Sequence, residues 1–288
     1  MKYVSFKAEG QSSYGIIHAK GVFDLGMRYG QLLPDLKAWL EAADLGLEPN
    51  LPKVLEADHR LRDIEHEVLI ANPAKIICVG VNYEEHRTET GRSKSDYPTI
   101  FTRFADTLIG HREPIIRPQV SEALDFEGEL AIVIGRGCYR VPQEHALDVI
   151  AGYTCFNDAT LRDWQRHSHQ FTPGKNFLST GALGPELVTP DEVGVLADLT
   201  IETKLNGQIV QSAKLGDMLF SVAEIIAYVT SFTPLAPGDI IATGTPGGVG
   251  FKREPALYMK DGDLIEVIIQ KVGHLENHIE DEDDEMDA

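Results

Sequence analysis

Short apolar runs, separated by glycine, proline and polar residues, recur along most of this chain. β-Branched residues are frequent in these runs, and both features are typical of strands in a β-sheet. The clearest runs lie at residues 75–79, 99–104, 125–135, 151–157, 199–204, 209–211 and 264–269. A longer segment at residues 217–232 has one wide apolar face and predicts the longest helix. The pattern therefore predicts a mixed α/β chain that is mainly β.

The chain divides near residue 70 into a small and a larger unit. Residues 1–70 predict a small α/β domain, with strands at 3–7, 14–18 and 21–24 and helices near 33–43 and 52–57. Residues 71–274 contain most of the predicted strands and form the second domain. Residues 275–288 are rich in acidic side chains, and we expect them to form a disordered tail.

The composition narrows the class of protein. Hydrophobic residues make up 43% of the chain and charged residues 25%, as in globular proteins. The formal net charge of −19 disfavours nucleic acid and anionic membranes as partners, because both bind basic surfaces. No apolar run is long enough to span a bilayer, and the first residues lack the apolar core of a signal peptide. The three cysteines, Cys78, Cys138 and Cys155, show no CxxC spacing and indicate buried thiols, so we expect a cytoplasmic location.

The run at 125–135 carries two carboxylates in an otherwise apolar strand. Because side chains alternate along a strand, Glu127 and Glu129 point to the same face. Two carboxylates on a half-buried face repel each other and lose hydration. Either one of them takes up a proton or a cation lies between them. A solvated sheet face is the simpler interpretation of this pair taken alone.

A short helix is predicted after the strand at 75–79. Asn82 and Glu85 have the spacing of a capping box, and Gly91 is a suitable end. On this helix His86 and Glu89 are three residues apart and therefore lie on one face. A carboxylate beside an imidazole raises its basicity and fixes its tautomer, although a surface pair is the simpler interpretation.

Other candidates follow the strand at 151–157. Asp158 is predicted to begin a helix on which Arg162 and Gln165 share its face, and an N-cap is the ordinary role of such an aspartate. Lys175 lies in a turn that enters a further strand and by itself indicates little. Residues 243–250 form a glycine-rich loop after another strand. Pro246 removes a backbone donor and no helix follows, so the glycines favour close approach to a small ligand over phosphate binding.

Taken together, the order of these pieces resembles the fumarylacetoacetate hydrolase family. The resemblance covers about residues 73–271. Its motifs, in the family's order, are VGVNYEEH at 79–86, DFEGELAIVIG at 125–135, FNDATLRDWQ at 156–165, GKNF at 174–177, LGP at 183–185 and TGTPGGVG at 243–250. It implies a curled β-sandwich or β-roll catalytic domain beside the small N-terminal domain, usually in a homodimer.

The resemblance also implies a metal site and a set of catalytic residues. A divalent cation would be held by Glu127, Glu129 and Asp158, and an all-carboxylate set favours Mg²⁺ or Mn²⁺, with Ca²⁺ as a further candidate, over zinc. The substrates would be 2-oxo acids or 1,3-diketones. His86 would activate water, with Glu89 orienting it, and Lys175 would hold substrate oxygens. The positions that match substrate-binding residues are Arg103, Arg162, Gln165, Thr245, Gly247 and Gly248.

Within the family, retention of the His86–Glu89 pair favours a hydrolase, because members without it tend to be isomerases, hydratases or dehydratases. We therefore expect metal-dependent cleavage of a C–C bond in a 2,4-dioxo acid such as fumarylpyruvate, as in aromatic catabolism. Oxaloacetate decarboxylation, or isomerisation or hydration of a 2-oxo acid, is the alternative. A non-catalytic metal-binding relative and a nucleotide-binding protein are the other classes considered. Arg103, where some relatives have lysine, and Ala159 and Thr160, where many have Trp-Ser, leave the substrate's identity open.

Overall fold

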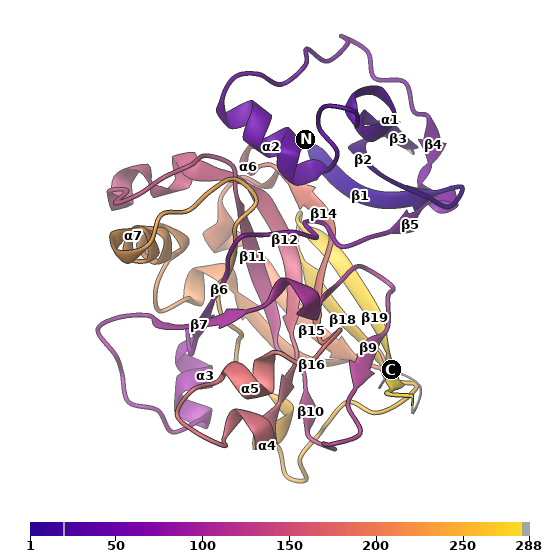
Figure 1. Cartoon of the computed structure of the whole chain (residues 1–288). Coiled ribbons are helices and arrows are strands. Elements are labelled where there is room, and N and C mark those ends of the chain that lie inside the picture. Colours follow the sequence, from indigo (N-terminus) through magenta and orange to yellow (C-terminus); the bar gives the residue numbers. More distant parts are fainter. Residues whose placement is uncertain (20, 284–288) are drawn as a thin grey trace.

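The computed structural model describes residues 1–19 and 21–283. Within them, most of the chain lies in two β-sheets that pack face to face, with short helices around them (Figure 1). The fold is mixed α/β and mainly β, as the pattern of apolar runs predicted. None of the helices in the described part of the chain is both long and apolar enough to cross a membrane.

The larger sheet is twelve-stranded and runs β4-β3-β2-β1-β14-β12-β11-β17-β6-β7, with β5 beside β1 and β8 beside β14. Its strands are β1 Lys2–Ala8, β2 Gln11–His18, β3 Gly21–Asp24, β4 His59–Arg60, β5 Glu65–His66, β6 Ile76–Gly80, β7 Thr99–Arg103, β8 Leu108–Ile109, β11 Gly128–Ile134, β12 Ile150–Asp158, β14 Gly181–Val188 and β17 Ile240–Ala242.

The smaller sheet runs β16-β15-β18-β19-β9. Its strands are β9 Ile115–Arg117, β15 Thr200–Leu205, β16 Gln208–Lys214, β18 Leu264–Ile269 and β19 Gly273–Asp281. Two further strands, β10 Leu124–Asp125 and β13 Thr160–Leu161, pair with each other. The helices are α1 Leu25–Tyr29, α2 Leu36–Asp44, α3 Glu84–Glu89, α4 Arg162–Gln165, α5 Thr172–Lys175, α6 Pro190–Val193 and α7 Val222–Phe232.

Strand β11 is the centre of the molecule because both of its faces are covered. Leu130 and Ile132 belong to the core between the two sheets, whereas Ala131 and Val133 belong to a second core that includes Trp39 of α2. The sheets approach closely at Gly128, where a Cβ atom would lie 2.1 Å from the Thr203 hydroxyl of β15. A strand buried on both faces reads as a continuous apolar run, which explains its pattern in the sequence.

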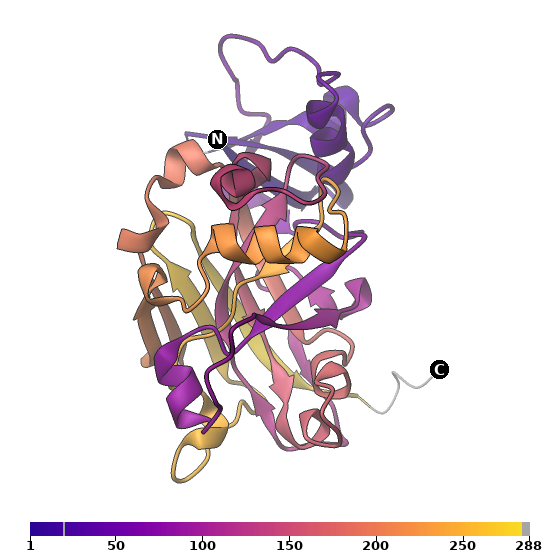
Figure 2. The same cartoon turned by 90° about the vertical axis from the view of Figure 1, so that its left-hand side faces the viewer.

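The N-terminal unit is joined to the larger sheet. Tyr3 of β1 pairs with Leu187 of β14, so the strands of residues 1–70 extend the sheet of residues 71–274. Figures 1 and 2 show this unit at one end of the sheets, while α3, α4, α5 and the loop after β17 gather at the other end. The chain segments that carry the candidate site residues therefore meet far from the N-terminal unit. The division into two domains stays a prediction.

Two predictions of local structure at the candidate site are wrong. The capping box is absent, because the Asn82 side chain instead accepts from the Phe220 amide at 2.8 Å and donates to the Thr243 carbonyl at 2.8 Å. Asp158 does not begin a helix but ends β12, and the helix starts only at Arg162. In both cases the side chain binds long-range partners, backbone groups for Asn82 and the side chains of Arg103 and Lys175 for Asp158, instead of capping a helix.

Three further segments differ from the prediction. Residues 52–57 form no helix, and the turn predicted around Lys175 contains the short helix α5. The acidic tail was predicted to be disordered from residue 275, yet β19 runs to Asp281, paired with both β18 and β9. Its alternating apolar residues, such as Leu275 and Ile279, are buried in the core between the sheets. Residues 284–288 lie outside the described part of the chain.

Candidate active site

Three buried carboxylates meet where β11 begins and β12 ends. One oxygen atom from each of Glu127, Glu129 and Asp158 lies within 4.8 Å of the other two, and each residue is at most 5% exposed. Antiparallel pairing creates this cluster, because the Asp158 amide donates to the Glu127 carbonyl at 2.8 Å. Asp158 therefore stands opposite Glu127, on the neighbouring strand of the sheet.

Buried cations neutralise two of the three carboxylates. The Lys175 ammonium lies 2.6 Å from Glu127 and 2.5 Å from Asp158, and Arg162 lies 2.6 Å from Glu127. Burial alone would raise the pKa of Glu127, but the charges of Lys175 and Arg162 outweigh it and lower that pKa. Burial opposes the charged form of Lys175, yet Asp158 and Glu127 raise its pKa and keep it an ammonium.

Glu129 is the carboxylate without a cation. It accepts a hydrogen bond from the Gly244 amide at 2.8 Å and forms no ion pair with any residue of 1–19 or 21–283. Burial, together with the charges of Asp158 and Glu127, raises the pKa of Glu129 well above its usual value. A buried carboxylate in this setting is stabilised by a nearby cation, and an all-oxygen donor set suits Mg²⁺ or Mn²⁺. The three residues thus fit a divalent metal.

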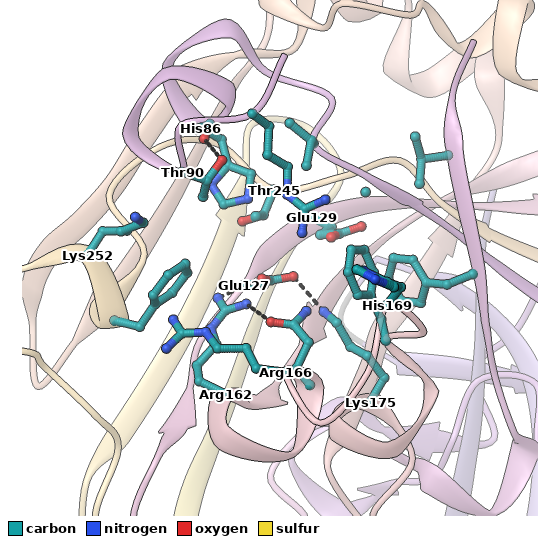
Figure 3. Close-up of a pocket in the computed structure, with 18 of the residues that line it drawn as sticks. His86, Thr90, Glu127, Glu129, Arg162, Arg166, His169, Lys175, Thr245 and Lys252 are labelled. Atoms are coloured by element: carbon teal, nitrogen blue, oxygen red, sulfur yellow. Dashed lines mark hydrogen bonds and ion pairs between the residues drawn. The ribbon is translucent and has the colours of Figure 1, made fainter. Parts of the chain in front are cut away.

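His86 faces the carboxylates across the cavity, opposite Arg162 and Lys175 (Figure 3). Its Nδ1 lies 2.7 Å from Glu89 Oε1, and the Gly248 amide donates to Glu89 Oε2 at 2.9 Å. Because a carboxylate accepts hydrogen bonds, this contact places the proton on Nδ1 and leaves Nε2 as the base. In the predicted His86–Glu89 pair, His86 is therefore buried and Glu89 is half-buried and anchored. Gly248 anchors Glu89 instead of lining the cavity.

The cavity has a volume of about 480 Å³. Seven of the predicted site residues line it: His86, Glu127, Glu129, Arg162, Gln165, Lys175 and Thr245. Glu89 and Asp158 lie one layer behind, where they contact His86 and Lys175. Gly247 does not line the cavity either, because it packs against the Glu85 side chain.

Arg103 was predicted to bind substrate, and the structure contradicts this. Its side chain is fully buried and does not line the cavity. The guanidinium donates to Asp158 at 2.7 Å and to Thr180 at 2.7 Å, and it also reaches the Ala159 carbonyl at 3.1 Å. Arg103 therefore holds the rear oxygen of Asp158 instead of meeting the cavity.

Two residues without a predicted role, Asp125 and Gln211, hold the site together. Asp125 accepts from Arg162 at 2.7 Å and from the Gly250 amide at 2.8 Å. Gln211, on the smaller sheet, donates to the Thr245 hydroxyl at 2.8 Å. In the sequence, the only sign of a role for Asp125 was its place at the start of the 125–135 motif. The sequence contained no sign of a role for Gln211, because its partners are distant in the chain.

Comparison with known proteins identifies the family. Residues 75–280 match the family described as fumarylacetoacetate (FAA) hydrolase, C-terminal. The chain belongs to the fumarylacetoacetate hydrolase family. The resemblance found in the sequence is thereby confirmed, and so is the fold that it implied.

Relatives in the fumarylacetoacetate hydrolase family include enzymes of several kinds. The oxaloacetate tautomerase YisK of Bacillus subtilis is 39% identical over 225 residues, which cover 77% of this chain and 75% of YisK. The structure of a putative HpcE protein from Mycobacterium smegmatis matches with a TM-score of 0.87 and 31% identity over 98% of this chain and 100% of that one. A maleylpyruvate hydrolase from Sphingobium matches with a TM-score of 0.78 and 26% identity, again over 98% and 100%. This chain therefore belongs to a family of enzymes that includes tautomerases and hydrolases.

Proposed function

We propose that this protein is a metal-dependent enzyme that interconverts the keto and enol forms of an oxaloacetate-type 2-oxo acid. The similarity to oxaloacetate tautomerases supports this proposal over C–C hydrolysis, which the sequence had favoured. The observation that carries it is the arrangement of His86 across the cavity from Glu127, Glu129 and Lys175. This arrangement provides a base, an electrophilic site and a cation in one cavity.

The residues have separate tasks in this reaction. A divalent cation held by Glu127, Glu129 and Asp158 would supply an electrophile that favours the enolate over the ketone. His86 Nε2 accepts the proton from C3 of the substrate, and the C–H electron pair becomes the C2–C3 double bond. The imidazolium then returns the proton to the C2 oxygen, so no other reactant is consumed. Lys175 offsets the negative charge on the substrate, as a fixed cation in a dry site does.

The test is a keto–enol exchange assay on oxaloacetate, in which the ultraviolet absorbance of the enol is followed with Mg²⁺, with Mn²⁺ and with chelator. We expect metal-dependent acceleration above the spontaneous rate and its loss in His86→Asn. His145→Asn is the matched control, because His145 forms a similar pair with Asp148 at 3.3 Å but is exposed and does not line the cavity. Equal rates with and without protein would refute the proposal.

Hydrolysis of an acylpyruvate is the second candidate, and the anchored His86–Glu89 pair favours it. The same Nε2 atom can take a proton from water instead of carbon, and the water then attacks the distal carbonyl. Fumarylpyruvate is the test substrate, with loss of diketone absorbance and release of pyruvate as the readout. Pyruvate formed from oxaloacetate would instead indicate decarboxylation. A homodimer and a cytoplasmic location stay predictions.

A further inference from the structure

Three cationic side chains at the cavity have no acidic partner in the described part of the chain. Arg92, Arg166 and Lys252 line the cavity, and none forms an ion pair within residues 1–19 and 21–283. Each lies over an aromatic ring instead: Arg92 at 5.0 Å from the centre of Phe171, and Arg166 and Lys252 at 4.6 and 5.4 Å from that of Phe251. In a chain with a net charge of −19, such a group gives the cavity a positive potential of its own.

The carboxylates on the cavity floor have their charge balanced by other groups than these three cations. The floor group consists of four carboxylates and three cations: Asp125, Glu127, Glu129 and Asp158, with Arg103, Arg162 and Lys175. A divalent cation and the 2-oxo carboxylate of one substrate molecule would make this group neutral. A second anionic group on the substrate would then pair with cations outside the floor group.

Phe251 links Arg166 and Lys252 to the floor group. The Phe251 amide donates to Asp125 at 3.1 Å, and the same carboxylate accepts from Arg162 at 2.7 Å. The Phe251 ring also packs 4.4 Å from the Arg162 guanidinium. Arg166 and Lys252 lie over the Phe251 ring, and the Phe251 amide binds Asp125 of the floor group. Both cations therefore lie beside the floor group. Figure 3 shows Lys252 to one side of Glu127 and Arg162.

We propose that Arg166 and Lys252 form a subsite for the second carboxylate of a dianionic 2-oxo acid. The subsite makes the enzyme selective for dicarboxylates over monocarboxylates with the same 2-oxo head. This inference rests on the proposed function for the position of that head, which lies at the carboxylate cluster. The guanidinium of Arg166 donates hydrogen bonds to the carboxylate, and Lys252 adds a second charge at the exposed mouth.

The test compares two ligands of the same chain length, 2-oxoglutarate and 2-oxopentanoate, which differ in the distal carboxylate. Their affinities are measured by calorimetry with Mg²⁺ present. We expect the wild type to prefer 2-oxoglutarate, and Arg166→Gln to weaken 2-oxoglutarate binding by about tenfold. Lys252→Gln should have a smaller effect, because an ammonium lacks the paired donors that a guanidinium offers to a carboxylate. Both effects should weaken at high salt, because both side chains are exposed. Binding of 2-oxopentanoate should stay unchanged in both variants.

Lys260→Gln is the matched control, because it removes one exposed positive charge that does not line the cavity. Arg166→Lys should keep part of the preference if the folded site is intact. The subsite is refuted if the wild type binds both ligands equally, if it binds neither, or if Arg166→Gln weakens both to the same extent. Failure of the proposed reaction gives a different result: no keto–enol exchange on oxaloacetate, with the preference for 2-oxoglutarate retained.

Discussion

Arg103 is the residue whose replacement tests the architecture of the site most directly. Arg103→Met leaves the rear oxygen of Asp158 without its donor at 2.7 Å, in a place that is 0% exposed. It also removes the bond to Thr180 at 2.7 Å. Removing one partner of a buried ion pair costs about 3–5 kcal/mol, because the other charge stays buried. Since Lys175 still contacts Asp158, we expect the lower part of this range, about 3 kcal/mol.

The measurement is urea unfolding at pH 7 of Arg103→Met, Asp158→Asn and the double variant. If the cost arises from the uncompensated carboxylate, Asp158→Asn should relieve it, with a coupling free energy of about 2–3 kcal/mol. The matched control is Arg112→Met, which breaks an ion pair of similar length, 2.6 Å to Glu276, with the arginine side chain 72% exposed. That change should cost at most about 1 kcal/mol. A coupling free energy below about 0.5 kcal/mol would refute the reasoning.

Three further predictions concern a metal ligand, a buried histidine and a close contact between sheets. Glu129→Gln should weaken Mn²⁺ binding, measured by calorimetry, at least about tenfold. It should not lower the stability of the metal-free protein, because it removes a buried carboxylate that pairs with no cation among the described residues. Unchanged Mn²⁺ affinity would exclude Glu129 as a ligand. Burial and nearby His66 lower the pKa of His111 to about 4, so the unfolded chain binds the extra proton first and stability falls as the pH drops from about 6.5 towards 4. His111→Asn keeps an acceptor for the Glu276 amide and should lose less stability over that range; parallel pH profiles would contradict this. Gly128→Ala should lower the free energy of unfolding by about 1–3 kcal/mol, because its Cβ would lie 2.1 Å from the Thr203 hydroxyl; an unchanged urea midpoint would mean that β11 and β15 are not held so close.

Local pattern determined which segments are strands. The run at residues 264–269 is β18 with the bounds predicted, and the apolar run at 125–135 contains β11. Apolar alternation is a local property, so each strand can be read from its own residues. The motifs around Glu127, His86 and Lys175 likewise predicted the family and seven of the residues that line the cavity. β19 was not predicted as a strand because acidic residues alternate with its apolar residues. Those apolar residues are buried only when β19 pairs with β18 and β9.

The partners of the site residues were decided by the tertiary structure. Arg103 and Asp158 lie on strands far apart in the chain, and the anchor of Glu89 is the amide of Gly248. No local pattern records which strands pair or in what register, because these depend on how the whole core closes. The sequence by itself determined the family, many of the strands and the residue types of a carboxylate site. The fold alone decided that Arg103 lies behind Asp158, and that the unpaired Arg166 and Lys252 stand at the mouth.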